Sequence, residues 1–361
     1  MVRFKFIIMS NTLNQNVKQF QQLLSPQDLR SKVPTTEQID KLVLESRVAV
    51  QNILDHKDDR MLIICGPCSI HDPDAAFEYA EKLAKLRDKV KNKIFLVMRV
   101  YFEKPRTTIG WKGLITDPHI DGSDKIEDGL LLARKVLLKI ASLGLPAATE
   151  FLDPIVPQFT SDLISWAAIG ARTTESQTHR MMASGLSMPV GFKNNTTGNK
   201  KAAVNAMQSA LNSHSFLGVG DDGKISVVTT KGNNYGHIIL RGGDGLPNYD
   251  EESIKEAGDL LRAGNLNPAI MVDCSHANSG KKFEKQEVAW NSVLKQRASG
   301  NKDLIGLMLE SNLQEGNQSL PELKAGENTL AKLKYGVSIT DACVSFSATE
   351  ELFDQAMTIL P

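Results

Sequence analysis

The sequence has few cysteines, no excess of charge of either sign and no long apolar run. Its 361 residues include only 4 cysteines, too few for a disulfide framework, and free thiols suit a reducing cytoplasm. Lys plus Arg equals Asp plus Glu at 42 each, so no overall field favours nucleic acid or an anionic membrane surface. No apolar run approaches the roughly 20 residues of a membrane span. These absences predict a cytoplasmic protein with no nucleic-acid or membrane partner.

The first 60 residues differ in character from the rest of the chain. Residues 10–60 are polar and rich in Gln, and a helical pattern runs from Thr36 to Leu54. The apolar patch from Phe6 to Met9 is far shorter than the roughly 7 to 15 residues of a signal-peptide core, and Met9 is an alternative start. We therefore predict an N-terminal arm with an oligomeric or regulatory role over residues 1–60, and one large domain over residues 61–361.

From Met61 onward, short apolar runs alternate with longer amphipathic stretches. Continuous apolar runs of this length are typical of strands buried on both faces, as in parallel sheets. The runs are MLIIC, IFLVMR, AATEF, AAIGART, PVGFKN, HIILRG, AIMVDCSH and LIGLMLES. Eight strands alternating with helices favour an α/β fold of the (β/α)₈ or TIM-barrel type, with a doubly wound open sheet as the alternative.

Capping and turn residues set the limits of several other elements. Asp72 as N-cap and Pro73 in the first turn predict a helix from Pro73 to Val90. A second helix is predicted from Gly129 to Leu143, closed by Gly144. Residues 214–230 interrupt the alternation, because two β-like runs flank an Asp-Gly turn. We expect an inserted hairpin there.

The ends of the predicted strands carry charged side chains and possible metal ligands. Active sites of parallel barrels lie where these ends open into loops. The residues at the ends are Cys68, Arg99, Glu150, Arg172, Lys193, Arg241, His276 and Glu310. Four cations at one mouth would repel one another unless anions bind there, and phosphate and carboxylate groups suit the guanidinium fork. The loop after Arg99 adds Lys104, Arg106 and Thr107, which predicts a second anion.

Cys68, His276, Glu310 and Asp341 form a candidate metal set. Each residue alone has a structural explanation, as a small core residue, a capped histidine, a strand-end carboxylate or a loop N-cap. Together their sulfur, nitrogen and oxygen donors suit one divalent transition metal, Mn, Fe, Co or Zn. Because no two of these residues are close in sequence, spacing alone leaves both interpretations open.

Cys65 and Cys68 also form a C-x-x-C, which is typical of a thiol–disulfide couple or half of a zinc site. Redox cysteines of this kind gain reactivity at a helix N-terminus, whereas here the predicted helix begins beyond the motif, at Asp72. No second C-x-x-C completes a four-cysteine zinc site. We favour Cys68 as a lone loop ligand and Cys65 as an inward strand residue, with a disulfide between them as the alternative.

Between Met61 and Cys343 the sequence resembles the metal-dependent 3-deoxy-D-arabino-heptulosonate 7-phosphate (DAHP) synthases of the type I class. The resemblance rests on GPCSIHD, YFEKPRTTIGWKGLI, ATEFLDP, ISWAAIGARTTESQTHR, PVGFKN, HIILRGG, DCSHANS, ESNLQEGNQS and YGVSITDAC, in this order. It implies a (β/α)₈ barrel that condenses phosphoenolpyruvate with D-erythrose 4-phosphate and water, giving DAHP and phosphate. This reaction is the first step of the shikimate pathway of aromatic amino-acid biosynthesis.

The resemblance also implies roles for individual residues. The implied metal ligands are Cys68, His276, Glu310 and Asp341. The implied phosphoenolpyruvate site comprises Arg99, Lys104, Ala171, Arg172, Lys193 and Arg241. The implied contacts with the sugar phosphate are Lys104, Pro105, Arg106 and Thr107. Lys104, His276 and Glu150 are the implied catalytic residues, and either Glu150 or the metal would activate the attacking water. The chain departs from the family at Cys65 and in the loop from Ser319 to Tyr335, which is several residues longer than usual.

Family members of this type add an arm and a hairpin that form a pocket for a feedback inhibitor, which is phenylalanine, tyrosine or tryptophan. By resemblance, the pocket residues are Pro157, Gln158, Gly185, Leu186, Ser187, Phe216 and Gly218. The alternative is that they only pack the hairpin onto the barrel. Gly218 resembles the tyrosine-inhibited isozymes, whereas the phenylalanine-inhibited ones tend to carry serine, so we predict tyrosine. An exposed arm and hairpin predict a homodimer or homotetramer.

Two other functions are kept as alternatives. A metal-dependent aldolase on the same barrel would need a metal and one phosphate clamp, but not so many converging cations. A non-catalytic amino-acid sensor would keep the inhibitor pocket and could dispense with the metal ligands. Consumption of phosphoenolpyruvate with and without a chelator distinguishes these functions.

Overall fold

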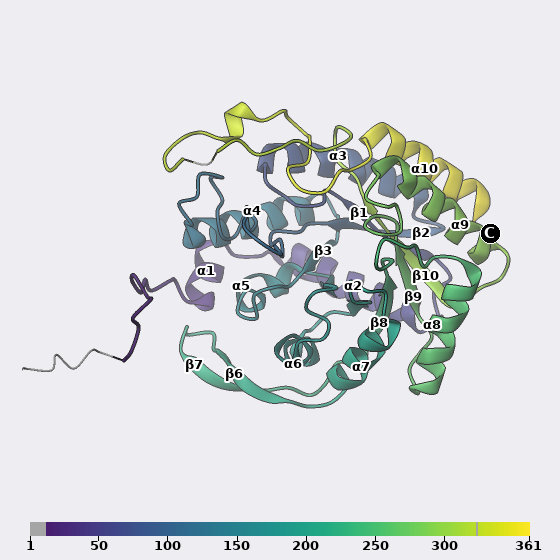
Figure 1. Cartoon of the computed structure of the whole chain (residues 1–361), viewed down its shortest axis with the longest axis horizontal. Helices are drawn as coiled ribbons and strands as arrows, with labels where there is room; N and C mark the ends of the chain where they lie inside the picture. Colours follow the sequence, from purple (N-terminus) through teal and green to yellow (C-terminus); the bar gives the residue numbers. More distant parts are fainter. Residues whose placement is uncertain (1–11, 323) are drawn as a thin grey trace, which may run out of the picture.

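The computed structural model describes residues 12–322 and 324–361, so the Phe6 to Met9 patch and the alternative start lie outside the described residues. Eight parallel strands close into a barrel in the order β1-β10-β9-β8-β5-β4-β3-β2 (Figure 1). The strands are β1 (Met61–Gly66), β2 (Ile94–Arg99), β3 (Ala147–Glu150), β4 (Trp166–Ile169), β5 (Val190–Lys193), β8 (Gly236–Leu240), β9 (Ile270–Asp273) and β10 (Leu304–Glu310). Every predicted strand is confirmed. The open-sheet alternative is wrong, because β1 pairs with both β2 and β10.

Helices follow most strands and surround the barrel (Figure 1). They are α1 (Pro26–Lys32), α2 (Glu37–Leu54), α3 (Pro73–Val90), α4 (Ile126–Ser142), α5 (Pro157–Thr160), α6 (Gln177–Gly185), α7 (Lys200–Ala210), α8 (Glu251–Ala263), α9 (Gln286–Ala298) and α10 (Phe346–Ile359). Short 3₁₀ turns occupy Ser161–Leu163, Phe283–Lys285 and Leu330–Lys332. None of the helices in the described residues has the length and apolar character that a membrane crossing requires.

The predicted limits of α3 are confirmed, whereas those of α4 are wrong at its N-terminus. Asp72 caps α3 by accepting hydrogen bonds from the backbone N–H groups of Asp74 and Ala75. α4 begins three residues before Gly129, so this glycine is inside the first turn. A Cβ atom at Gly129 would lie 2.1 Å from the carbonyl oxygen of Ile115. The glycine therefore marks a close approach of two backbones and not a helix boundary.

The core has two layers, one inside the barrel and one between the strands and the helices. In β1, Leu62 and Ile64 belong to the inner layer, whereas Ile63 and Cys65 belong to the outer layer. The last turn of α2 packs against the inner layer and is held there by Asn267, which donates to the Leu54 carbonyl oxygen. Because Asn267 precedes β9, α2 covers the N-terminal end of the barrel, and the other end is available for the site.

The inserted hairpin is present as predicted. Its strands β6 (Ser215–Val219) and β7 (Ile225–Thr229) pair antiparallel and form a sheet separate from the barrel (Figure 1). α1 joins the hairpin turn to α5, because Arg30 lies 2.8 Å from Asp221 and donates to the Gln158 carbonyl oxygen at 2.9 Å. The N-terminal segment, the hairpin and α5 are thus physically connected.

Candidate active site

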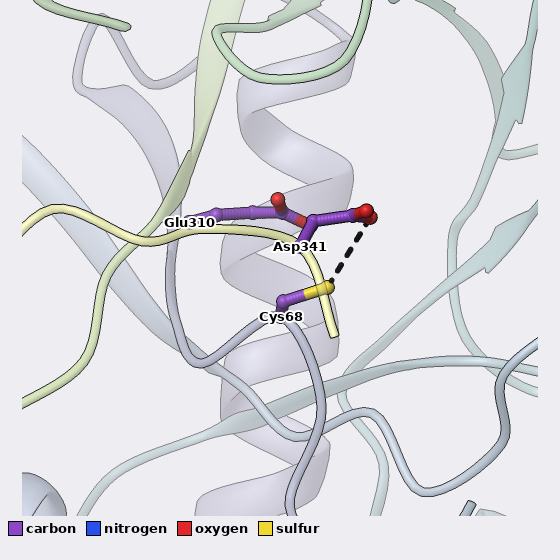
Figure 2. Close-up of side chains that lie close together, drawn as sticks. All are labelled: Cys68, Glu310 and Asp341. Atoms are coloured by element: carbon purple, nitrogen blue, oxygen red, sulfur yellow. Dashed lines mark hydrogen bonds between the residues drawn. The ribbon is translucent and has the colours of Figure 1, made fainter. Parts of the chain in front are cut away.

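A thiol and two carboxylates converge at the C-terminal ends of β1 and β10. Gly66 pairs with Glu310 across the two strands, which brings Cys68, two residues further on, beside that carboxylate. The ligand atoms of Cys68, Glu310 and Asp341 all lie within 4.8 Å of one another (Figure 2). Cys68 and Glu310 are buried, whereas the Asp341 side chain is 54% exposed, so the cluster can be reached from solvent.

These three donors fit a divalent transition metal, because one sulfur and two carboxylates form a mixed soft and hard set. His276, the fourth predicted ligand, lies at the same mouth but outside this trio. Its Nδ1 atom is 3.0 Å from Oδ2 of Asp273, and its backbone has a left-handed φ of 58°. The structure therefore brings together three of the four predicted ligands and pairs the fourth with a carboxylate.

Lys104 is in direct contact with the trio. Its Nζ donates to the Cys68 sulfur at 3.0 Å and lies 3.7 Å from Oδ2 of Asp341. Burial and the charge of Glu310 raise the pKa of the Cys68 thiol to about 11. Although burial acts in the opposite direction, the positive charges of Lys104 and His276 lower the pKa of Asp341 to about 2. The thiol is neutral at pH 7, so a metal must displace its proton on binding.

The predicted cations share one cavity next to this cluster. It is lined by Arg99, Lys104, Pro105, Arg106, Glu150, Ala171, Arg172, Lys193, Thr196, Arg241, His276, Lys281 and Asp341. Thr107 lies in the same loop as Lys104 but is exposed and outside this lining. Among the described residues, Nη1 of Arg99 and Nε of Arg241 are buried without a hydrogen-bond partner. Buried N–H donors of this kind need an acceptor, and an anionic ligand supplies one.

Two of the cations are balanced by buried carboxylates. Arg99 Nη2 is 2.9 Å from Oε1 of Glu310, and Lys193 Nζ is 2.9 Å from Oδ2 of Asp273. Burial opposes ionisation of Asp273, but the charges of His276 and Lys193 outweigh it and hold its pKa well below the usual range. The site is therefore a network of alternating charges, with Arg241 and the exposed Arg172 as its less compensated cations.

Sequence reasoning missed several residues of this mouth. Asp273 bridges Lys193 and His276, and Ser275 donates to Oε2 of Glu310 at 2.7 Å. Both belong to the DCSH segment, where a carboxylate at a strand end was a signal that could have been used. Thr196 and Lys281 also line the cavity, but they lie in loops, where no periodicity marks them.

The two thiols of the C-x-x-C have different surroundings. The Cys65 sulfur lies 3.2 Å from the Tyr79 hydroxyl on α3, so it faces the helix layer. Cys65 is therefore buried as predicted, but it points towards the helices and not into the barrel interior. Cys68 instead donates to Oδ2 of Asp341 at 3.5 Å. All four cysteines are free, which does not favour the disulfide alternative.

The predicted inhibitor-pocket residues lie on three segments around the hairpin. Pro157 and Gln158 begin α5, Gly185 and Leu186 end α6 with Ser187 next to them, and Phe216 and Gly218 lie on β6. A Cβ atom at Gly185 would lie 2.8 Å from Cγ2 of Thr230 at the base of the hairpin. A Cβ atom at Gly218 would lie equally close, at 2.7 Å, to Cγ2 of Val228 on the paired strand β7. The end of α6 is therefore in contact with the hairpin, and α5 is linked to it through α1.

Glu103, next to Lys104, is buried and predicts a pH-dependent stability. Burial raises its pKa to about 8, although the backbone N–H groups of Asp153 and Leu152 donate to it. The unfolded chain loses this proton near the ordinary value of 4.5, so between these two pKa values only the folded protein holds it. The contribution of this group to the free energy of unfolding therefore falls as pH rises through that window, by about 1.4 kcal/mol per pH unit at most.

We expect urea midpoints between about pH 5 and pH 9 to fall less steeply for Glu103→Gln than for the wild type. The same substitution at the exposed Glu81 is the control and should leave the slope unchanged. Equal slopes for wild type and Glu103→Gln would contradict this assignment.

Comparisons with known proteins agree with this geometry. The model of the DAHP synthetase I family matches residues 34–354. The chain is 50% identical to the Tyr-sensitive phospho-2-dehydro-3-deoxyheptonate aldolase of Escherichia coli K12, over 94% of this chain and 93% of that protein. It is 52% identical to the Phe-sensitive enzyme of the same strain, over 94% of this chain and 95% of that one.

A solved structure, that of phospho-2-dehydro-3-deoxyheptonate aldolase from Francisella tularensis SCHU S4, superposes with a TM-score of 0.91 at 44% identity. The match covers 96% of this chain and 98% of that one. The chain therefore belongs to the DAHP synthetase I family, the enzymes of EC 2.5.1.54.

Proposed function

We propose that this protein condenses phosphoenolpyruvate with D-erythrose 4-phosphate and water, giving DAHP and phosphate, at the start of the shikimate pathway. The observation that carries the proposal is the single cavity in which six predicted cations meet beside a thiol–carboxylate trio. Two phosphorylated reactants need such a concentration of positive charge, because their own charges repel. An aldolase with one phosphorylated substrate needs less of it.

The cations bind and orient the reactants. Arg99, Lys193 and Arg241 are the inner ligands for phosphoenolpyruvate, since all three lie at strand ends on the wall of the cavity. The exposed Arg172 completes this clamp. Lys104 points inward to the Cys68 sulfur, whereas Arg106 and Thr107 on the same loop are exposed, where the phosphate of erythrose 4-phosphate would enter. Holding both polyanions in this order brings C3 of phosphoenolpyruvate to the aldehyde carbon, so positioning supplies much of the catalysis.

Cys68, Glu310 and Asp341 would hold the divalent metal, with His276 as the fourth ligand. When bound, the metal supplies Lewis acidity towards an aldehyde oxygen. Lys104 is placed to balance the thiolate that metal binding creates, because its Nζ already contacts the Cys68 sulfur. A mixed donor set of this kind accepts Mn, Fe, Co or Zn.

Glu150 is our candidate for proton transfer. Among the described residues that line the cavity, Glu150 and Asp341 are the two carboxylates, and Asp341 belongs to the metal trio. After C3 of phosphoenolpyruvate has bonded to the aldehyde carbon, water adds at C2 and must lose a proton. Glu150 is buried at this wall and can accept that proton, after which the intermediate releases phosphate.

The test follows phosphoenolpyruvate and phosphate in a mixture of the purified protein with both substrates. We expect turnover that stops on addition of a chelator and returns with Mn²⁺. Turnover that a chelator does not affect would contradict the metal role. Absence of turnover with metal restored would favour the amino-acid sensor, and cleavage of a sugar phosphate without phosphoenolpyruvate would favour the aldolase.

We further propose that tyrosine inhibits the enzyme at the pocket around the hairpin. Relatives of both sensitivities match about equally well, so tyrosine is proposed from Gly218, where a missing side chain leaves room for a phenolic hydroxyl. A Cβ atom there would lie 2.7 Å from Cγ2 of Val228, so even a small side chain must displace that methyl group and reduce the space.

Replacing Gly218 with Ser should shift inhibition from tyrosine towards phenylalanine by about tenfold, the lower end of the range for a small steric change in a binding pocket. The measurement is the inhibitor concentration that halves turnover for each amino acid. The uninhibited rate should not change, because Gly218 lies outside the cavity lining. Unchanged inhibition by both amino acids would show that the inhibitor does not bind next to Gly218.

We also propose a homodimer or homotetramer that uses the N-terminal arm, residues 1–60, and the hairpin. Several large apolar side chains are exposed on these two segments: Val17, Phe20, Leu217, Ile225 and Val227. Such a group of exposed apolar side chains is typical of an interface. Light scattering of the purified protein tests this proposal.

We also propose a cytoplasmic location, because all four cysteines are free and a reducing compartment keeps thiols in that state.

A further inference from the structure

The ring of Tyr101 lies against Arg99 of the proposed phosphoenolpyruvate site, although neither sequence nor family assignment gave it a role. It follows β2 by two residues, and its side chain is 1% exposed within the inner layer of the barrel. The Cζ atom of Arg99 lies 3.6 Å from the centre of its ring. This distance is well inside the roughly 6 Å limit for a cation–π interaction, and the contact is desolvated, where such interactions are strongest.

The other contacts of Arg99 leave one edge of its guanidinium group for a ligand. Nε donates to the Pro67 carbonyl oxygen at 3.0 Å. Nη2 donates to the Cys68 carbonyl oxygen at 3.0 Å and to Oε1 of Glu310 at 2.9 Å. Within the described residues Nη1 has no hydrogen-bond partner, and Arg99 lines the cavity. These hydrogen bonds fix two edges of the plane, and the Tyr101 ring supports one of its faces.

Tyr101 is itself held by its backbone and by packing. Its carbonyl oxygen accepts a hydrogen bond from Ile70 N–H at 2.9 Å, which ties the loop after β2 to the Cys68 loop. Its hydroxyl has no hydrogen-bond partner among the described residues. A buried hydroxyl without a partner does not stabilise the fold. The ring, not the hydroxyl, is therefore the part of Tyr101 that acts on Arg99.

We propose that Tyr101 is a positioning residue for phosphoenolpyruvate: its ring fixes the plane of the Arg99 guanidinium so that Nη1 is directed at the anion. Because Arg99 also holds Glu310 and the Cys68 carbonyl oxygen, the same plane aligns the anion with the metal ligands. The inference rests on the proposed function, since it takes phosphoenolpyruvate as the ligand of Arg99.

The test uses two substitutions in the full-length protein, Tyr101→Phe, which keeps the ring, and Tyr101→Leu, which removes it. Direct binding of phosphoenolpyruvate without erythrose 4-phosphate is measured by calorimetry, and KM for each substrate is measured separately. We expect Tyr101→Leu to weaken phosphoenolpyruvate binding about tenfold, with KM for erythrose 4-phosphate and the affinity for Mn²⁺ changed less than about threefold. Tyr101→Phe should stay within about twofold of the wild type.

Several results would overturn the inference. One is phosphoenolpyruvate affinity in Tyr101→Leu within about twofold of the wild type. Another is an equal loss in Tyr101→Phe, which would make the hydroxyl the active part. Equal weakening of both substrates and Mn²⁺ would indicate a merely structural role. Tyr101→Met provides a second variant without a ring if Tyr101→Leu does not fold. Failure of the wild type to bind phosphoenolpyruvate would overturn the proposed function itself, which is a different result from each of these.

Discussion

Replacing Cys68 with Ser should weaken metal binding by at least about 100-fold and abolish turnover at low metal concentration. Loss of a residue that only supports a metal ligand typically costs 10- to 100-fold in affinity, so loss of a ligand should cost at least as much. A hydroxyl keeps the size of the side chain approximately but is a harder and much less acidic donor than a thiol. Titration with Mn²⁺, followed by the paramagnetic resonance of the free ion, measures the change directly.

Cys65→Ser is the matched control for this experiment. Cys65 is also fully buried and lies three residues away, but its sulfur faces Tyr79 in the helix layer. We expect its metal affinity and its turnover at saturating metal to stay near the wild-type values. Equal loss in both variants would indicate that the two cysteines act together, as in the disulfide alternative. Retention of metal binding in Cys68→Ser would show that the Cys68 thiol is not a metal ligand.

The contrast between these cysteines illustrates what the sequence predicts well. Strand alternation alone would place Cys65 on one face of β1, and both faces are buried in a parallel barrel. The apolar runs therefore predicted every strand, because buried parallel strands are continuous in sequence. The hairpin was predicted for a similar reason, since the Asp-Gly turn between two β-like runs is a local signal. Local signals of this kind need no knowledge of the fold.

Features that depend on backbone contact were predicted less well. Gly129 looked like the start of α4, but it lies inside the helix, and the residue is a glycine because the Ile115 carbonyl group leaves no room for a side chain. The contact joins segments that no pattern relates. Likewise, the loop from Ser319 to Tyr335 is tied to the loop after β2 by a hydrogen bond from Gly326 N–H to Oδ2 of Asp121 at 2.8 Å. The length of this loop does not predict the hydrogen bond.

Side-chain pairings in the site could not be derived from sequence either. The cations at the strand ends were predicted as a group, because barrel geometry brings strand ends together. Which carboxylate balances which cation depends on side-chain direction. Lys193 and Asp273 are 80 residues apart, and Arg99 and Glu310 are 211 residues apart. Asp273 was therefore missed, although its segment was recognised.

The Arg99–Glu310 pair leads to a prediction about stability as well as activity. The side chains are 2% and 1% exposed, so the pair is almost fully desolvated. Removal of one partner from a buried pair leaves an uncompensated charge and typically costs about 3 to 5 kcal/mol. An exposed pair such as Arg262–Asp303, in which the arginine is 52% exposed, is worth about 1 kcal/mol or less.

Arg99→Met should therefore abolish turnover and lower the free energy of unfolding of the metal-free protein by about 3 to 5 kcal/mol, measured by urea denaturation. Arg262→Met is the control and should lower it by less than about 1 kcal/mol. Saturating Mn²⁺ should reduce the penalty in Arg99→Met, because a bound cation gives Glu310 a new partner and stabilises only the folded state. The double variant Arg99→Met with Glu310→Gln should recover part of the loss without metal, since no buried charge is left. An equal penalty with and without metal would show that Glu310 does not face the ion, and would exclude it from the metal ligands.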